Sequence, residues 1–159
     1  MPFSIGGHPG FNAPFIEGES ISDYYVEFSP AGKYVTAKFT EDGFDSGETF
    51  ALDLIDDKIF PIKDDIFIAN DSAFMPNPPT SLTLKSNKNG RFVKVSASDM
   101  TYFGLWKATK PNSNFICLEP WLGFAPKENE IADLSTKAHL IHLDGKKTFN
   151  TGYEIEIRE

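Results

Sequence analysis

The residue most able to do acid–base chemistry is a carboxylate set into an apolar stretch late in the chain. Residues 114–118 are largely apolar and β-favouring between turn residues, which is typical of a buried strand. Proline at position 120 has no backbone N–H to donate to a sheet, so we expect the strand to end at Glu119. The aromatic rings of Trp121 and Phe124 would lie around the Glu119 carboxylate. Partial desolvation among such neighbours raises a carboxyl pKa and suits Glu119 to act as a general base near neutral pH.

A second unusual segment lies near the start of the chain. His8 stands in residues 4–12, whose three glycines and one proline favour a tight backbone that a ligand can approach closely. A glutamate and a histidine held on two such segments could form the base and the acid of one site. The alternative for Glu119 is a strand-end carboxylate in solvent, since most glutamates in proteins are exposed.

Four stretches of the chain resemble the aldose 1-epimerase (galactose mutarotase) family, most closely its LacX-type branch. They are IGGHPGFN at 5–12, FPIKDDIF at 60–67, YFGLW at 102–106 and NFICLEPWLGFA at 114–125. The resemblance runs from about residue 4 to the final predicted strand. It implies a mutarotase site in which Glu119 is the base and His8 is the acid.

The resemblance also implies residues that orient the sugar, namely Asp64, Asn12 and Trp121. Spacing to the apolar pair that follows favours Asp64 over its neighbour Asp65. From the residues alone, Asp64 could equally be a solvated strand start or a cap. Trp106 could lie at the mouth of the site or in the core beneath it.

The chain departs from the family in length. Family members are roughly twice as long and carry the GGHPGF segment near their middle, whereas here His8 is the eighth residue. We therefore interpret residues 1–159 as a single β-sandwich domain, the C-terminal half of an aldose 1-epimerase-like domain. The other half would bring an arginine and another histidine to the sugar, so we expect impaired activity from this chain alone.

The expected reaction interconverts the α and β anomers of a hexose such as galactose or glucose by general acid–base ring opening. It requires no metal or redox cofactor, so we expect none. His139 and His142 are three apart in an expected strand and would point to opposite sides, which disfavours a metal site. The alternative function is a non-catalytic carbohydrate-binding β-sandwich, in which Trp106, Trp121 and Phe124 stack on a sugar.

Composition narrows the class of protein. The net charge is −8 and the 15 Lys and Arg residues are scattered, so nucleic acid is not an expected partner. Apolar runs fall short of the ~18 residues of a membrane span, and the start does not read as a signal peptide, so we expect no membrane. Cys117 is the only cysteine, which excludes an intrachain disulfide and suits a reducing cytoplasm.

The elements that must position these residues are mostly strands. At least eight strand candidates against two or three single-turn helices predict an all-β, antiparallel β-sandwich, which the resemblance sharpens to half of a supersandwich. Strands are predicted at 23–28, 33–39, 50–54, 80–85, 92–97, 138–143, 147–149 and 153–158, beside 114–118. Exposed loops are predicted at 41–48 and 75–79, a helical turn at 56–60 and a short helix at 131–135. A halved sandwich leaves open edges, so we expect self-association or pairing with the missing N-terminal half.

Overall fold

The computed structural model describes residues 1–110, 113–130 and 133–159. Strands dominate these residues, with about 43% of the chain in strands and 6% in helices, so the all-β prediction is confirmed. The strands are β1 Pro2–Phe3, β2 Ile5–Gly6, β3 Gly10–Asn12, β4 Tyr24–Ser29, β5 Val35–Phe39, β6 Asp45–Ala51, β7 Ile59–Pro61, β8 Ser72–Pro76, β9 Ser81–Ser86, β10 Phe92–Ser96, β11 Tyr102–Trp106, β12 Phe115–Leu122, β13 Ile141–His142 and β14 Glu154–Arg158. The helices are the 3₁₀ turn η1 Ile21–Asp23 and α1 Asp65–Asn70.

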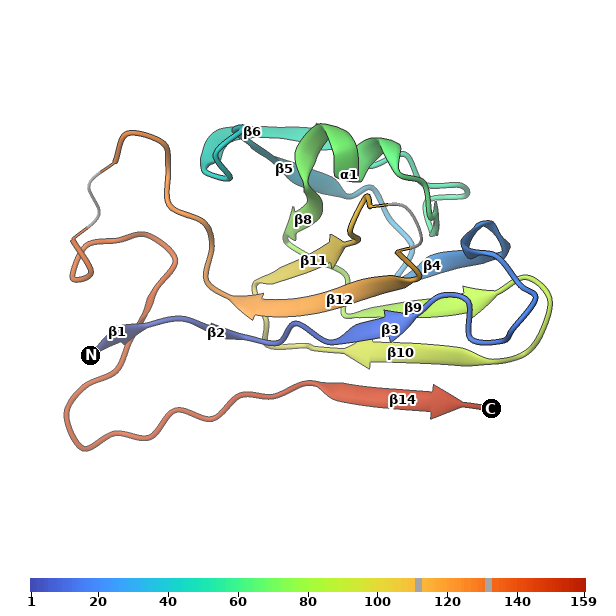
Figure 1. Cartoon of the computed structure of the whole chain (residues 1–159). Helices are drawn as coiled ribbons and strands as arrows, with labels where there is room; N and C mark the ends of the chain where they lie inside the picture. The colour runs from blue at the N-terminus through green and yellow to red at the C-terminus, as the bar shows by residue number, and fades with distance from the viewer. Residues whose placement is uncertain (111–112, 131–132) are drawn as a thin grey trace.

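Two five-stranded antiparallel sheets form the predicted sandwich (Figure 1). The first sheet has the order β14-β10-β9-β4-β7, and the second has the order β2-β12-β11-β8 with β3 also paired to β12. One hydrophobic core fills the space between them. It includes Val26, Phe28, Leu82, Leu84 and Val95 from the first sheet and Met75, Phe103, Leu105, Ile116 and Leu118 from the second.

The second sheet has two unlike faces, because successive side chains of a strand point to opposite sides. In β11, Phe103 and Leu105 enter the core, while Gly104 and its alternate neighbours face outward. Register pairs Gly104 with Phe74 of β8 on one side and with Glu119 of β12 on the other. Figure 1 shows β5, β6 and α1 on the outer side of this sheet and β9 and β10 on the inner side.

The prediction that the central strand ends at Glu119 is wrong, because β12 continues through Pro120 to Leu122. The neighbouring strand on one side is interrupted between β2 and β3. At this interruption Pro120 offers only its carbonyl, which accepts a hydrogen bond from the Gly7 N–H at 2.9 Å. A proline is tolerated in a strand where no partner requires its missing N–H.

Several peripheral predictions also need correction. The expected loop at 41–48 overlaps β6, whose residues beyond Asp45 are exposed and therefore lack an apolar alternation. The loop expected at 75–79 begins inside β8, and no strand forms at 147–149. In the expected helical turn at 56–60, Asp56 and Asp57 adopt positive φ angles of 52° and 55°, which break a helix.

Two further predictions concern helices. The short helix expected at 131–135 falls partly outside the described residues, since 131 and 132 are not among them, and residues 134–136 form a turn. No helix in the described ranges is long and apolar enough to cross a membrane.

Candidate active site

The register of the second sheet places His8 opposite Glu119. Both β2 and β3 pair with β12, but the three residues between them do not continue the ladder, and His8 is the middle one. Gly10 pairs with Cys117 on one side of this gap. The His8 Nε2 atom consequently lies 3.0 Å from Glu119 Oε1. The structure thus brings together His8 and Glu119, the two residues of distant segments that the sequence analysis proposed as acid and base.

Two glycines make room for this arrangement. A Cβ on Gly6 would lie 2.0 Å from Cε3 of Trp121, so only glycine lets the indole lie against β2. A Cβ on Gly104 would lie 2.9 Å from a ring carbon of Phe74 and 3.4 Å from the Glu119 Cβ. The missing side chain at Gly104 leaves open space next to the carboxylate.

Glu119 is a buried carboxylate with one oxygen lacking a hydrogen bond. The residue is 6% exposed, and its Oε2 accepts a hydrogen bond from Trp121 Nε1 at 3.1 Å. Oε1 has no hydrogen-bond partner among the described residues, although the half-exposed His8 ring lies close to it. Burial raises the pKa of Glu119 and the negative charge of Asp71 adds to the rise, against the opposing effects of Trp121 and His8. A carboxylate with a raised pKa is a better base at neutral pH.

The carboxylate lies in an open cleft of about 340 Å³ with aromatic walls. Trp106 and His8 meet edge to face at 5.8 Å between ring centroids. Phe124, another residue that lines the cleft, is stacked on Tyr102 with 4.9 Å between ring centroids. The lining residues are Ser4, His8, Asp71, Ser72, Phe74, Gly104, Trp106, Glu119, Trp121, Gly123, Phe124 and Ala125.

The structure separates the predicted sugar-orienting residues. Trp121 lines the cleft, whereas Asp64 and Asn12 are not among the lining residues. Asp64 stands at the N-cap of α1, and its Oδ1 accepts a hydrogen bond at 2.8 Å from the nearly buried ammonium of Lys107. Asn12 is an exposed residue at the end of β3 that pairs with Phe115.

Asp71 is a cleft residue that the sequence reasoning missed. It follows α1 with φ of 59°, and its Oδ1 accepts a 3.4 Å hydrogen bond from Trp106 Nε1. The buried Asn70 side chain holds this turn by donating to the carbonyls of Ala37 and Ser72, both at 2.8 Å. An Asn-Asp pair between a helix and a strand was the available signal, because Asn and Asp tolerate positive φ better than most residues.

The donor atoms of His8, Cys117 and Glu119 lie within 4.8 Å of one another. Burial and the adjacent Glu119 raise the pKa of the Cys117 thiol to about 11, so it is protonated at neutral pH and is a poor nucleophile. The later histidine His139 hydrogen-bonds through Nδ1 with the Tyr102 hydroxyl at 2.8 Å.

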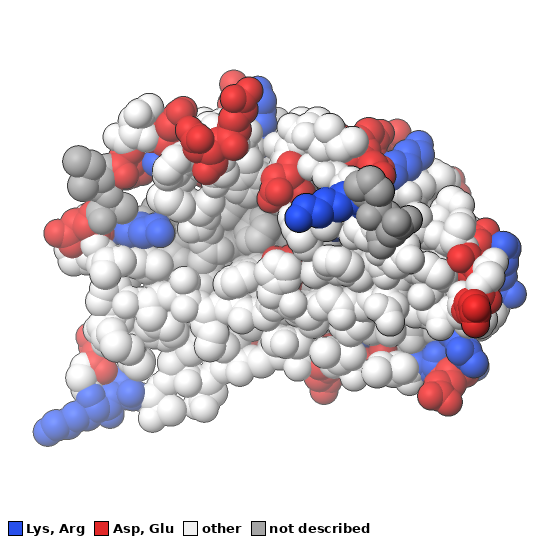
Figure 2. Space-filling view, viewed as in Figure 1, with Lys and Arg blue, Asp and Glu red and all other residues white. Residues whose placement is uncertain are grey.

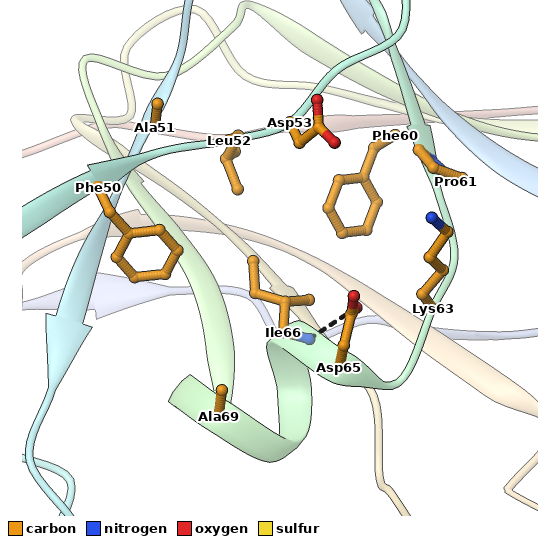
Figure 3. Close-up of a pocket in the computed structure, with 10 residues that line it drawn as sticks. All are labelled: Phe50, Ala51, Leu52, Asp53, Phe60, Pro61, Lys63, Asp65, Ile66 and Ala69. Carbon is orange, nitrogen blue, oxygen red and sulfur yellow. Dashed lines mark hydrogen bonds between the residues drawn. The ribbon is translucent and has the colours of Figure 1, made fainter.

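Another cavity, of about 330 Å³, lies between β6, β7 and α1. Figure 3 shows Phe50, Phe60 and Ile66 around it, with the Asp65 carboxylate accepting a hydrogen bond from the Ile66 N–H at 2.8 Å. No histidine or cysteine is among the described residues that line it. The pair of His8 and Glu119 thus lies in the other cleft.

Known proteins resemble the chain over almost its full length. The plasmid and chromosomal LacX proteins of Lactococcus lactis subsp. lactis are each 32% identical over 158 residues, which is 99% of this chain and 52% of theirs. A galactose mutarotase related enzyme from Lactobacillus acidophilus has a TM-score of 0.89 and 26% identity, covering 100% of this chain and 53% of its own. A galactose mutarotase-like protein from Lactobacillus casei has a TM-score of 0.87 and 22% identity, covering 99% and 54%.

No protein-family model matches the chain. The chain spans about half the length of the curated relatives that it matches. The resemblance inferred from the four sequence motifs is confirmed by these relatives. The chain is a homologue of the LacX proteins over about half of their length and has the galactose mutarotase-like fold.

Proposed function

We propose that this chain carries the acid–base pair of an aldose 1-epimerase that interconverts the α and β anomers of a hexose. The observation that carries the proposal is the 3.0 Å approach of His8 Nε2 to Glu119 Oε1 in an open, aromatic-walled cleft. The two groups differ as an acid–base pair requires. Glu119 is buried and its pKa is raised, whereas His8 is half exposed on the facing loop.

In the proposed reaction, Glu119 accepts the proton of the anomeric hydroxyl while protonated His8 donates a proton to the ring oxygen. The bond between the anomeric carbon and the ring oxygen breaks, and the anomeric C–O becomes a carbonyl. Rotation about the adjacent C–C bond exposes the other face, and the reverse proton transfers close the ring. Each transfer needs a donor–acceptor distance of about 2.6–3.2 Å. The sugar must therefore insert its two oxygens between groups that now face each other directly.

The cleft favours an uncharged sugar over a phosphorylated one. Its described lining has carboxylates at Asp71 and Glu119 but no lysine or arginine. Trp106, Trp121 and Phe124 offer apolar faces, and the Asp71 carboxylate can accept hydrogen bonds from sugar hydroxyls. Figure 2 shows charges of both signs around the rim of one face and a broad uncharged middle. The carboxylates of Asp71 and Glu119 would repel a phosphate, and no lysine or arginine of the described lining would offset this repulsion.

The chain alone should act slowly. The chain spans about half the length of its curated relatives, so residues from the other half of such a protein would supply the remaining contacts to the sugar. Loss of positioning contacts lowers the rate even when the reacting groups are present.

The test is polarimetry of freshly dissolved α-D-galactose and α-D-glucose with the full chain at high concentration. We expect anomer exchange faster than the spontaneous rate. Glu119→Gln should lower the rate above this spontaneous background at least about 100-fold. His8→Asn should also lower it strongly. Galactose 6-phosphate and glucose 6-phosphate should be exchanged less efficiently than the free sugars.

Glu48→Gln is the matched control, because Glu48 is an exposed carboxylate that pairs with Lys38 away from the cleft. This variant should retain the wild-type rate. Exchange that persists unchanged in Glu119→Gln would refute the proposal. Sugar binding without exchange in the wild type would instead support a carbohydrate-binding module.

A further inference from the structure

We propose that His8, Cys117 and Glu119 bind a thiophilic divalent cation, of which Zn²⁺ is the physiological example. The proposal adds a second use of the cleft beside His8 and Glu119, because mutarotation needs neither a metal nor the Cys117 thiol. It rests on the position of three donor groups and on one unsatisfied buried oxygen.

The donor atoms lie near the spacing of a metal site. Cys117 and Glu119 are two residues apart on β12 and therefore point to the same side, and His8 faces them from the loop between β2 and β3. Their donor atoms lie within 4.8 Å of one another. Zinc–ligand bonds of about 2.0–2.3 Å place tetrahedral ligands about 3.5 Å apart, so the cluster must contract by about an ångström. His8 is half exposed and can supply this movement.

A second observation concerns the Oε1 atom of Glu119. The residue is 6% exposed, and this oxygen has no hydrogen-bond partner among the described residues. A buried carboxylate oxygen without a hydrogen bond costs free energy, and a bound cation would offset that cost. The same oxygen lies 3.0 Å from His8 Nε2, which is close enough for one ion to contact both atoms.

The ligand set selects the kind of ion. A thiolate with an imidazole and a carboxylate suits Zn²⁺ or Cd²⁺, whereas Mg²⁺ and Ca²⁺ prefer oxygen ligands. On binding, the metal–sulfur bond replaces the S–H bond of Cys117 and the thiol proton leaves to solvent. His8 and Glu119 line the open cleft, from which water or another small ligand would reach a fourth position, whereas Cys117 lies buried beneath it.

The experiment is a titration of the full chain with Cd²⁺, followed by ultraviolet difference absorption and calorimetry. Cys117 is the only cysteine, so a sulfur-to-cadmium charge-transfer band would report on it alone. We expect one Cd²⁺ per chain with such a band, competition by Zn²⁺, and no competition by Mg²⁺. Cys117→Ser should abolish the band, and His8→Asn should weaken binding at least about tenfold.

His142→Asn is the matched control, because His142 is an exposed histidine away from the cleft. It should bind Cd²⁺ as the wild type does. Absence of the band in wild-type protein, or binding unaltered by both His8→Asn and Cys117→Ser, would overturn the proposal. The exposed position of His8 makes its variant informative even if Cys117→Ser folds poorly.

A second readout, inhibition of anomer exchange by Zn²⁺, rests on the proposed function. The ion would occupy both His8 and Glu119, so exchange should stop when the site is filled. Cd²⁺ binding with no anomer exchange at any metal concentration would refute the proposed function and leave the metal site standing. Exchange in the presence of saturating Cd²⁺ would show that the ion binds elsewhere and would refute the metal site.

Discussion

Glu119 is unfavourable for folding in its charged form. Burial raises its pKa above the ordinary value of 4.5, so the folded protein holds this proton more tightly than the unfolded chain. Between the ordinary and the raised pKa the native state therefore binds more protons, and its stability falls as pH rises. Above the raised pKa the loss is complete. A carboxylate suited to proton abstraction thus lowers stability at neutral pH.

We predict that Glu119→Gln is more stable than the wild type at neutral pH. The amide resembles the protonated carboxyl, which the folded site favours, and it can still accept the Trp121 hydrogen bond. The stability difference should disappear below pH 4.5 and grow as pH rises. Urea denaturation across this pH range measures it.

Glu48→Gln provides a control of opposite sign, because the Lys38 ion pair lowers the pKa of Glu48. Its stabilising charge is lost as pH falls, so this variant should be slightly less stable than the wild type at neutral pH and equal to it in acid. A Glu119→Gln variant that is less stable than the wild type at neutral pH would contradict the burial argument.

The residues of the cleft were predictable where their types were unusual. The glycine-rich segment around His8 and the carboxylate at Glu119 drew attention because each stands in a context that is rare for its type. The acid near Trp106 was not predictable, because Asp64 and Asp71 lie at opposite ends of α1. Only the course of this short helix decides that Asp71 lines the cleft while Asp64 pairs with Lys107.

At the scale of elements, the contact between β2 and β12 supports the site. Gly6 of β2 pairs with Trp121 of β12, and the indole lies where a Cβ on residue 6 would be. The same indole donates to Glu119. The packing of one edge strand therefore determines whether the Glu119 carboxylate keeps its hydrogen bond.

We predict that Gly6→Ala destabilises the protein by about 1–3 kcal/mol, the usual cost of overpacking. The methyl group must displace the Trp121 ring, which lies 2.0 Å from the Cβ position. The rate of anomer exchange should also fall, because moving the indole weakens the hydrogen bond from Trp121 to Glu119. Thermal unfolding and tryptophan fluorescence measure the two effects.

Gly145→Ala serves as the control, because nothing lies within 4 Å of a Cβ built there. It should leave both stability and fluorescence unchanged. A Gly6→Ala variant with wild-type stability and fluorescence would show that Trp121 moves at no cost and does not order the site.

Elements were predictable where alternation or turn chemistry is strong. The hairpin of β9 and β10 follows from alternating apolar residues on either side of an Asn-Gly turn. The continuation of β12 past Pro120 was not, because it depends on an interruption in a strand more than 100 residues away. Long-range pairing decides such cases, and a single strand does not encode it.

At the scale of the whole molecule, β14 leaves an edge of the first sheet open among the described strands (Figure 1). Ile155 and Ile157 are 44% and 68% exposed along this strand. Exposed edges of this kind pair readily with another strand. If β14 pairs antiparallel with a second copy about Glu156, then Glu154 faces Arg158 of the partner subunit and Ile155 faces the partner's Ile157. Glu156 then faces the partner's Glu156 at the centre, and this repulsion keeps the dimer weak.

We therefore predict a weak, concentration-dependent dimer through β14, measured by sedimentation velocity. Arg158→Glu should favour the monomer, because it sets two glutamates opposite each other. The double variant Glu154→Arg with Arg158→Glu should dimerise again, since the pair is reversed but still complementary. Within the chain these positions face Ser96 and Phe92 of β10, so the swap leaves the intrachain pairs without new charge repulsion. A wild type that stays monomeric at high concentration, or a double variant no more dimeric than Arg158→Glu, would exclude this pairing.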